Sequence, residues 1–331
     1  MGAKGRTVTI SDVAAEAGVA PMTVSRVINT SDRVAAATAE RVQAAISRLG
    51  YVPNLMAGGL SSRRSRMVGA IVPTIAHPMF ATLIDSLTET LRAAGYQVML
   101  SLSGYKGGED ELVRGLLGRR PDGMLVTGVE HAPSTRQMLQ DAGIPVVEIF
   151  DIGKRPIDML VGFDHAAVGA AVAEYFLVRG HDRFAMFSAG DRRALARQHG
   201  FAERVAAGGG QLISAPVLAA PSTITAGREA MRALLPVLDH RTALFCSSDL
   251  LAFGAIVEAR QSGIAVPDRL AVCGFGDFEL GAASEPSFTT VTVEAARIGR
   301  NAAAMILARL VGQTVERRIE VPFRIVQRGS S

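Results

Sequence analysis

Residues 8–30 read VTISDVAAEAGVAPMTVSRVINT, a sequence that predicts two short helices joined by a glycine turn. Thr9 can cap the first helix, and Asp12 places an acid in its first turn, where the helix dipole favours negative charge. Gly18 can adopt the left-handed conformation that a sharp turn between helices requires. Pro21 suits the first position of the second helix because its φ is fixed and it has no N–H. This order of elements is typical of the helix-turn-helix of many DNA-binding proteins.

The second predicted helix runs from Pro21 to about Asn29 and has one apolar and one polar side. Val24, Val27 and Ile28 recur at helical spacing, so we expect them to face inward. Small, polar and cationic side chains on the other side suit a DNA major groove, where they contact phosphates and base edges. An ordinary helical hairpin with a solvated face would show the same spacing. The outward residues are Met22, Thr23, Ser25, Arg26 and Asn29.

Three stretches resemble the DNA-binding headpiece of the lactose-repressor and galactose-repressor (LacI/GalR) family: VTISDVAAEAGV, MTVSRVIN and ERVQAAISRLGYVPN. A fourth, LGYVPNLMAGGL, follows a predicted third helix at about 36–49 and resembles the family's hinge helix. The resemblance implies a homodimer, or a larger assembly, on a near-palindromic operator, with Leu60 as a wedge in the minor groove. The residues that it assigns to DNA binding are Thr9, Pro21, Met22, Thr23, Ser25, Arg26, Asn29, Tyr51, Asn54, Ala57 and Leu60.

The hinge segment is a poor helix former. Gly58 and Gly59 each cost about 1 kcal/mol relative to alanine inside a helix. We therefore expect the hinge to be coil in the free protein and helical on DNA. Ala35 stands where the third helix would have a hydroxyl cap, which weakens that helix as well.

The composition is that of a globular protein with room for two or three domains. Of its 331 residues, 48% are hydrophobic and 20% are charged. There is no apolar run of about 18 residues and no signal-peptide core, so we expect a cytoplasmic protein with no membrane partner. Cys246 and Cys273 lack metal-ligand spacing and lie in apolar stretches, which predicts buried thiols and no metal or cofactor.

The net charge of +4 hides an asymmetry. Residues 1–66 hold nine Lys and Arg against four Asp and Glu, a net charge of +5, and the remainder has 26 against 27, a net charge of −1. Arg63, Arg64 and Arg66 lie beside the hinge. A local basic surplus attracts phosphate, and next to a helix-turn-helix it favours DNA binding over a merely solubilising role.

From Met67 onward, short β-rich apolar runs alternate with amphipathic helical stretches. Continuous apolar strands joined by helices predict parallel sheets covered on both faces. One sheet would need too many strands, so we expect two subdomains with a cleft at the carboxyl ends of their strands. The predicted fold is a small all-α helix-turn-helix headpiece followed by a two-subdomain α/β effector domain with doubly wound parallel sheets.

This part of the chain also resembles the periplasmic-binding-protein-like effector domain of the same family, through motifs such as VGAIVPTIAHPMF and ALFCSSDLLAFGAIVEARQSG. The expected boundaries are 1–52 for the headpiece, 53–66 for the hinge and 67–331 for the effector-binding and dimerisation domain. Within the last, we expect one subdomain at about 67–163 plus 292–318 and the other at about 164–291 plus 319–331.

Loops after the predicted strands carry the candidate effector contacts: Met79, Phe80, Asp164, Arg193, Arg197, Ser248, Asp249 and Asp277. Polyhydroxyl ligands bind carboxylates and guanidinium groups and pack on apolar faces. The family resemblance places Phe80, Arg197, Asp249 and Asp277 near the effector. Because Asp at a strand-to-helix junction is also a normal N-cap, capping is the alternative role for Asp164, Asp249 and Asp277.

We expect the effector to be a small sugar, a sugar acid or its phosphate, and the sequence favours the acid. Residues 274–277 read GFGD where sugar-binding relatives commonly have GFDD, so one carboxylate is absent. Arg192 and Arg193 can form a cation pair for a ligand carboxylate, or can be ordinary surface residues. With APMTVSR and PIDMLVGFDH, the pattern resembles the gluconate-operon repressor subgroup, which implies a gluconate-like acid or its phosphate, acting as inducer or corepressor.

Two other classes of protein share an α/β architecture. An enzyme is disfavoured, since no GxGxxG opens the first β-α unit and GxxxxGK[ST], GxSxG and HExxH are absent. The six histidines lack metal-ligand spacing, and we expect His77 and His165 to line the cleft and the others to be exposed. A periplasmic-type sugar-binding module would have no use for residues 7–60. The sequence thus favours a DNA-binding regulator, most simply a repressor.

Overall fold

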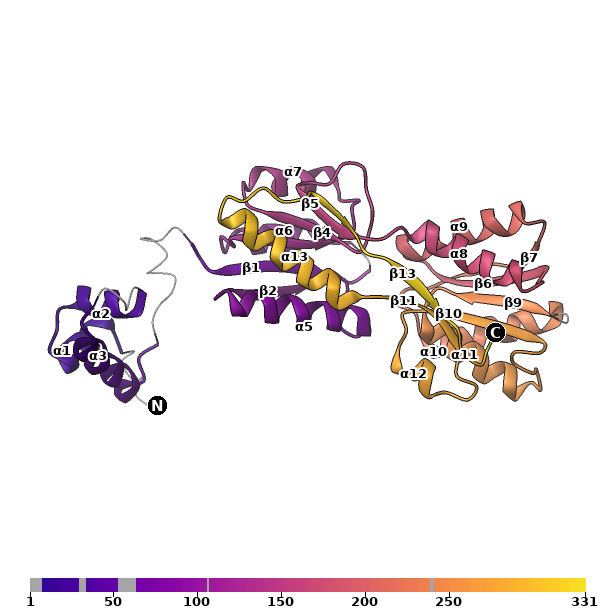
Figure 1. The fold of residues 1–331 in the computed structure, drawn as a ribbon, viewed down its shortest axis with the longest axis horizontal. Coiled ribbons are helices and arrows are strands. Elements are labelled where there is room, and N and C mark those ends of the chain that lie inside the picture. Colours follow the sequence, from indigo (N-terminus) through magenta and orange to yellow (C-terminus); the bar gives the residue numbers. More distant parts are fainter. Residues whose placement is uncertain (1–7, 30–33, 53–63, 106, 239–240) are drawn as a thin grey trace, which may run out of the picture. The chain divides into compact units, whose positions relative to one another are not determined.

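The computed structural model describes residues 8–29, 34–52, 64–105, 107–238 and 241–331. The chain forms two compact units, Met1–Ser65 and Arg66–Ser331 (Figure 1). None of the helices in these described ranges has the length and apolarity to cross a membrane.

The first unit contains the helices α1 (Ile10–Ala17), α2 (Pro21–Asn29) and α3 (Ala36–Leu49). Thr9 and Asp12 form a capping box at the start of α1, in which the Thr9 N–H donates to Asp12 Oδ2 at 2.8 Å. Gly18 ends α1 in the left-handed conformation with φ 63°. The predicted cap and turn are therefore confirmed.

A small apolar core holds the three headpiece helices together. Arg48 of α3 also pairs with Glu16 of α1, and Ala35 precedes α3 without a side-chain cap. Because α2 buries Val24 and Val27, its opposite side is left exposed, as the spacing predicted. The buried residues of this core are Val13, Ala14, Ala17, Val24, Val27, Val42 and Ala45.

The second unit begins with a parallel sheet in the order β12-β5-β4-β3-β1-β2. Helices α5 and α13 contact each other against one face, and α6 and α7 cover the other. The strands are β1 (Met67–Val72), β2 (Gln97–Leu102), β3 (Gly123–Thr127), β4 (Val146–Ile149), β5 (Met159–Gly162) and β12 (Arg318–Glu320). The helices are α5 (Pro78–Ala93), α6 (Glu109–Leu117), α7 (Pro133–Asp141) and α13 (Ala295–Leu310).

A second sheet has the order β13-β11-β10-β9-β6-β7, with β8 also paired to β6. All its pairs are parallel except β11 with β13. Helices α8 and α9 lie on one side and α10 and α11 on the other (Figure 1). The strands are β6 (Arg183–Ala189), β7 (Gln211–Ser214), β8 (Val217–Leu218), β9 (Thr242–Cys246), β10 (Leu270–Phe275), β11 (Thr289–Val293) and β13 (Phe323–Val326). The helices are α8 (His165–Val178), α9 (Arg192–Ala207), α10 (Ile224–Leu234), α11 (Asp249–Gln261) and the short α12 (Glu279–Ala283).

The chain crosses between these two sheets three times. It leaves the first sheet after β5, returns after β11, and crosses again between β12 and β13. Thr292 pairs with Arg324 in the second sheet, and Ile319 pairs with Val161 in the first. The last two crossings therefore follow Val293 and Glu320. Each lies two residues beyond the expected subdomain boundary, which was after residue 291 for the first and after residue 318 for the second.

Helices α8 and α9 approach each other through two glycines. A methyl group added to Gly169 of α8 would lie 2.0 Å from the carbonyl oxygen of Arg197. One added to Gly200 of α9 would lie 2.0 Å from the carbonyl oxygen of Ala166. Only glycine permits this backbone contact, which fixes Arg197 beside the first turn of α8.

We expect Gly200→Ala to destabilise the second unit by about 1–3 kcal/mol or more, because the two helix backbones must move apart. Gly115→Ala is the matched control: it lies in α6, and the nearest atom to an added methyl is Arg119 Nη1 at 3.9 Å. There alanine should be neutral or stabilising by about 0.5–1 kcal/mol. Urea unfolding measures both, and equal stability of the two variants would contradict the helix contact.

Candidate ligand-binding cleft and DNA-reading helix

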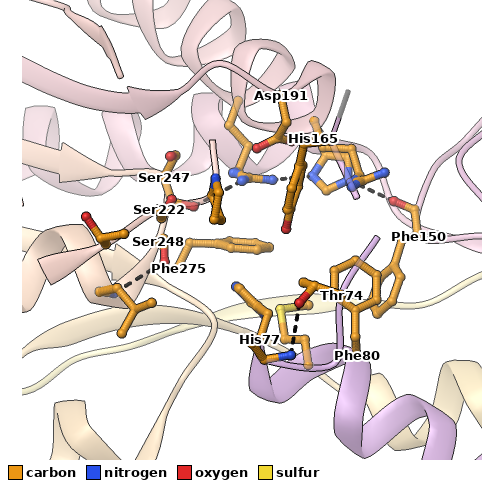
Figure 2. Close-up of a pocket in the computed structure, with 18 of the residues that line it drawn as sticks. Thr74, His77, Phe80, Phe150, His165, Asp191, Ser222, Ser247, Ser248 and Phe275 are labelled. Atoms are coloured by element: carbon orange, nitrogen blue, oxygen red, sulfur yellow. Dashed lines mark hydrogen bonds between the residues drawn. The ribbon is translucent and has the colours of Figure 1, made fainter. Parts of the chain in front are cut away.

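A cavity of about 320 Å³ lies between the two sheets of the second unit, where loops after their strands meet (Figure 2). Both subdomains contribute to its lining, as expected for a site at the carboxyl ends of parallel strands. Five of the eight predicted effector contacts line it: Met79, Phe80, Arg193, Arg197 and Ser248.

Five of the described helices begin at this cavity, and one of them is α8, whose first residue His165 lines it. His77 precedes α5, and the side chains of Asp191, Thr223 and Ser248 cap α9, α10 and α11. All four of these residues line the cavity. Because a helix N-terminus carries partial positive charge, this arrangement favours a negatively charged ligand.

Arg197 is the main charged group of the cavity and is only 5% exposed. Its Nη1 donates to His165 Nδ1 at 2.8 Å and its Nη2 to the Ser247 carbonyl at 3.0 Å. The guanidinium carbon lies 4.1 Å from the ring centroid of Phe275, and Nε has no hydrogen-bond partner within the described chain. Burial lowers the pKa of Arg197 to about 10, so the group stays cationic at neutral pH.

Aromatic rings form the apolar wall of the cavity (Figure 2). The rings of Phe80 and Phe150 meet edge to face with centroids 5.0 Å apart, and Phe163 and Phe275 are 6.1 Å apart. Burial, then the charge of Arg197, lowers the pKa of His77 to about 4, so this imidazole is neutral near pH 7. The wall therefore offers flat apolar faces on which the C–H groups of a sugar chain can pack.

Three of these wall residues were missed from the sequence. Phe150, Phe163 and Phe275 come at or directly after the carboxyl ends of β4, β5 and β10. Their common signal is an aromatic residue at the end of an apolar run. His77 and His165, which we expected in the cleft, do line it.

The three predicted aspartate contacts do not line the cavity. Asp164 caps α8 by accepting hydrogen bonds from two backbone N–H groups at 2.8 and 3.1 Å. Asp249 is fully buried and accepts from the Phe278 N–H and the Thr290 hydroxyl, and burial raises its pKa to about 6. Asp277 accepts from Arg328 at 2.6 Å. These carboxylates hold the loops of the second subdomain in place.

The two neighbouring arginines of the expected cation pair have separate environments. Arg192 pairs with Glu130 at 2.7 Å and with Asp151 at 3.5 Å, both in the first subdomain. Arg193 lines the cavity, with its guanidinium carbon 6.0 Å from the ring centroid of Phe80. Arg193 and Arg197 are four residues apart and so lie on the same side of α9, and both line the cavity.

His131 is buried, contrary to our expectation that it is exposed. It contacts Glu109 at 2.9 Å and the fully buried Glu148 at 3.3 Å. Burial alone would lower its pKa, but the hydrogen bonds to these two carboxylates outweigh burial and raise the pKa to about 9. The imidazolium of His131 thus compensates two acids of the first subdomain.

The charged form of His131 stabilises the folded state. This stabilisation is complete below the pKa of the histidine in the unfolded chain, about 6.5, and it is lost as pH rises through about 9, the pKa in the folded protein. We expect His131→Gln to cost about 3 kcal/mol at pH 6, because it leaves Glu148 buried without a cation. The difference from wild type should shrink towards pH 10 in chemical unfolding. His199→Gln, at an exposed histidine, is the control and should change little.

The side of α2 that we predict to contact DNA faces away from the headpiece core as far as it is described. Pro21, Met22 and Arg26 are exposed, Thr23 and Ser25 are half-buried, and Met22 is 66% exposed. Thr9 is exposed at the start of α1. Tyr51 packs against the headpiece core. The side chain of Asn29 and the predicted hinge contacts lie outside the described residues; the latter are Asn54, Ala57 and Leu60.

The chain joins a helix-turn-helix with an exposed polar face to an α/β unit that has a cavity between two subdomains. This combination defines a DNA-binding regulator with a small-molecule site. Residues 9–54 match the family model of bacterial regulatory proteins of the lacI family, and residues 173–331 match that of the periplasmic binding protein-like domain. The HTH-type transcriptional regulator GntR of Escherichia coli K12 is 32% identical over 330 residues, which cover 99% of both chains.

Solved structures agree with this assignment. A LacI-family regulator from Silicibacter pomeroyi is 32% identical and superposes with a TM-score of 0.91 over 98% of this chain and 99% of its own. The lac repressor dimer bound to operator shares the fold, with a TM-score of 0.86 at 24% identity over 98% of this chain and 99% of its own. The chain belongs to the lacI family of bacterial transcriptional regulators, and it is not an enzyme.

Proposed function

We propose that this regulator is a repressor of the cytoplasm that binds a near-palindromic operator as a homodimer and responds to a small sugar acid in the cleft. The choice of ligand rests on the environment of Arg197. Its guanidinium is buried, and its described hydrogen bonds go only to uncharged acceptors. A buried charge without a counterion is costly, and a ligand carboxylate relieves that cost through paired hydrogen bonds.

The charges around the cavity support an anion. Arg193 and Arg197 face it as cations, whereas the one carboxylate among the described lining residues, Asp191, accepts from the Ala194 N–H as a helix cap. His77 and His165 are neutral at pH 7, since burial lowers the pKa of both. The lining therefore carries a surplus of positive charge.

The remaining lining supports a short polyhydroxyl chain. Thr74, Ser222 and Ser248 contribute hydroxyl groups to the lining (Figure 2). The volume of about 320 Å³ is at the small end of the ~300–1,000 Å³ typical of ligand sites, which suits a monosaccharide-sized molecule. Together with the resemblance to gluconate-operon repressors, these features favour a gluconate-like acid.

Control of DNA binding requires the ligand to bind two arrangements of the subdomains unequally. A difference of about 1–3 kcal/mol in ligand affinity would change operator affinity about 5–150-fold. The operator-bound dimer structure of the lac repressor supports the proposed dimeric arrangement.

We expect Arg197→Ala to weaken gluconate binding about 100-fold, because a buried charge-assisted contact is lost, and to leave operator binding in the absence of ligand intact. Calorimetry with gluconate and with glucitol, its neutral analogue, measures the first effect, and a duplex selected from a random pool measures the second. Arg179→Ala, at an exposed arginine stacked on Tyr175, should bind gluconate as the wild type does. Equal wild-type affinity for gluconate and glucitol would refute a sugar-acid effector.

We expect Arg26→Ala to weaken binding to the selected operator about 5–150-fold, the range for loss of a base-reading contact of ~1–3 kcal/mol. Binding to unrelated duplex should fall less. Arg48→Ala removes the same charge from the headpiece at the far end of α3, where Arg48 pairs with Glu16, and is the matched control. If both variants lose operator affinity equally, Arg26 contributes charge alone and the recognition role of α2 is wrong.

A further inference from the structure

His165 connects the cavity cation to the opposite subdomain. It is the first residue of α8, and its Nε2 lies 2.8 Å from the Phe150 carbonyl at the end of β4. Its Nδ1 lies 2.8 Å from Arg197 Nη1. A guanidinium only donates and a carbonyl only accepts, so Nε2 carries the proton and Nδ1 is the acceptor.

The neutral state of this imidazole follows from its surroundings. His165 is 4% exposed, and its ring lies against Phe163 with centroids 4.4 Å apart. Burial, then the charge of Arg197, lowers its pKa well below 6.5. The charges of Arg193 and Arg192 in α9 lower its pKa further, and the hydrogen bond to the Phe150 carbonyl opposes them.

Two carboxylates near this assembly are already engaged. Asp151 is 3.5 Å from Arg192, and Asp191 accepts from the Ala194 N–H at the start of α9. Asp191 and Asp151 act on Arg197 only through space, where their charges raise its pKa, and its two described hydrogen-bond acceptors, His165 Nδ1 and the Ser247 carbonyl, are uncharged. Buried arginines are usually paired with carboxylates, which neutralise them.

We propose that His165 is a positioning residue that sets the charge selectivity of the cleft: it orients Arg197 without neutralising it, so that the site prefers an anion over an uncharged polyol of the same shape. This inference rests on the proposed function and deepens it. The Nδ1 lone pair of His165 orients the guanidinium of Arg197. Because His165 is neutral, it does not compensate the positive charge, which remains available to a ligand anion. A carboxylate at position 165 would satisfy the same N–H group and also supply the counterion that the ligand otherwise provides.

The test uses two variants that differ in charge and almost nothing else. In His165→Asn and His165→Asp, Oδ1 takes the place of Nδ1 as acceptor, and both lose the link to the Phe150 carbonyl. The probes are gluconate and glucitol, which differ at one terminal carbon. Calorimetry on the full-length protein gives the ratio of their affinities, which a purely structural defect would not change.

We expect the wild type and His165→Asn to prefer gluconate with similar ratios, although the Asn variant can lose affinity for both ligands. In His165→Asp, the ratio should fall at least about tenfold, because the new carboxylate neutralises Arg197 and repels the ligand acid. An unchanged ratio in His165→Asp would overturn the proposal, as would an equal collapse in His165→Asn. A wild type without preference for gluconate would instead refute the proposed sugar-acid effector.

A second measurement needs no variant and covers the case in which His165→Asp does not fold. The wild-type ratio should stay constant from about pH 8 to about pH 5.5, because His165 and His77 remain neutral and Arg197 remains charged over this range. A ratio that rises as pH falls through about 6.5 would mean that His165 becomes a cation and adds to the attraction for the anion. That result would contradict a neutral positioning role.

Discussion

The cleft depends on one constraint, the burial of the Arg197 guanidinium in a site where its described hydrogen bonds go to neutral acceptors. An unpaired charge in such a place is tolerable only if the protein fixes its geometry and stabilises it from other directions. The ring of Phe275 lies 4.1 Å below the cation. The backbone contact at Gly169 and Gly200 holds α9 against α8, so that Arg197 and His165 meet.

Contacts across the cleft link the ligand site to the spacing of the two subdomains. The hydrogen bond from His165 to Phe150 and the ion pair from Arg192 to Asp151 both cross it. On another side, the ring of His77 meets Phe278 edge to face with centroids 4.8 Å apart. Because Arg193 and Arg197 lie in the same helix as Arg192, a ligand held by the first two would act on an element that also binds the opposite subdomain. This shared helix is a physical route by which occupancy can bias the arrangement of the subdomains.

Local chemistry explains which features could be predicted from the sequence. The cap at Thr9 and the turn at Gly18 depend on neighbours within a few residues, and the alternation of strands and helices depends on hydrophobic period, so both were predictable. The roles of the aspartates at strand ends were not predictable, because the same sequence pattern fits a helix cap, as in Asp164, and a buried hydrogen-bond acceptor, as in Asp249. Phe150 ends an apolar run in the sequence, and only the tertiary arrangement makes the end of that strand part of the cavity wall.

The glycine at position 276 has a structural role of its own. It adopts a φ of 132°, a conformation that side chains rarely accept. A methyl group there would lie 2.5 Å from the ring of Phe278, so an aspartate at this position is incompatible with the present place of that ring. Phe278 is in turn fixed by its N–H bond to Asp249 and contacts His77 across the cleft. Glycine at position 276 therefore leaves room for the Phe278 ring in the place from which it contacts His77 of the opposite subdomain.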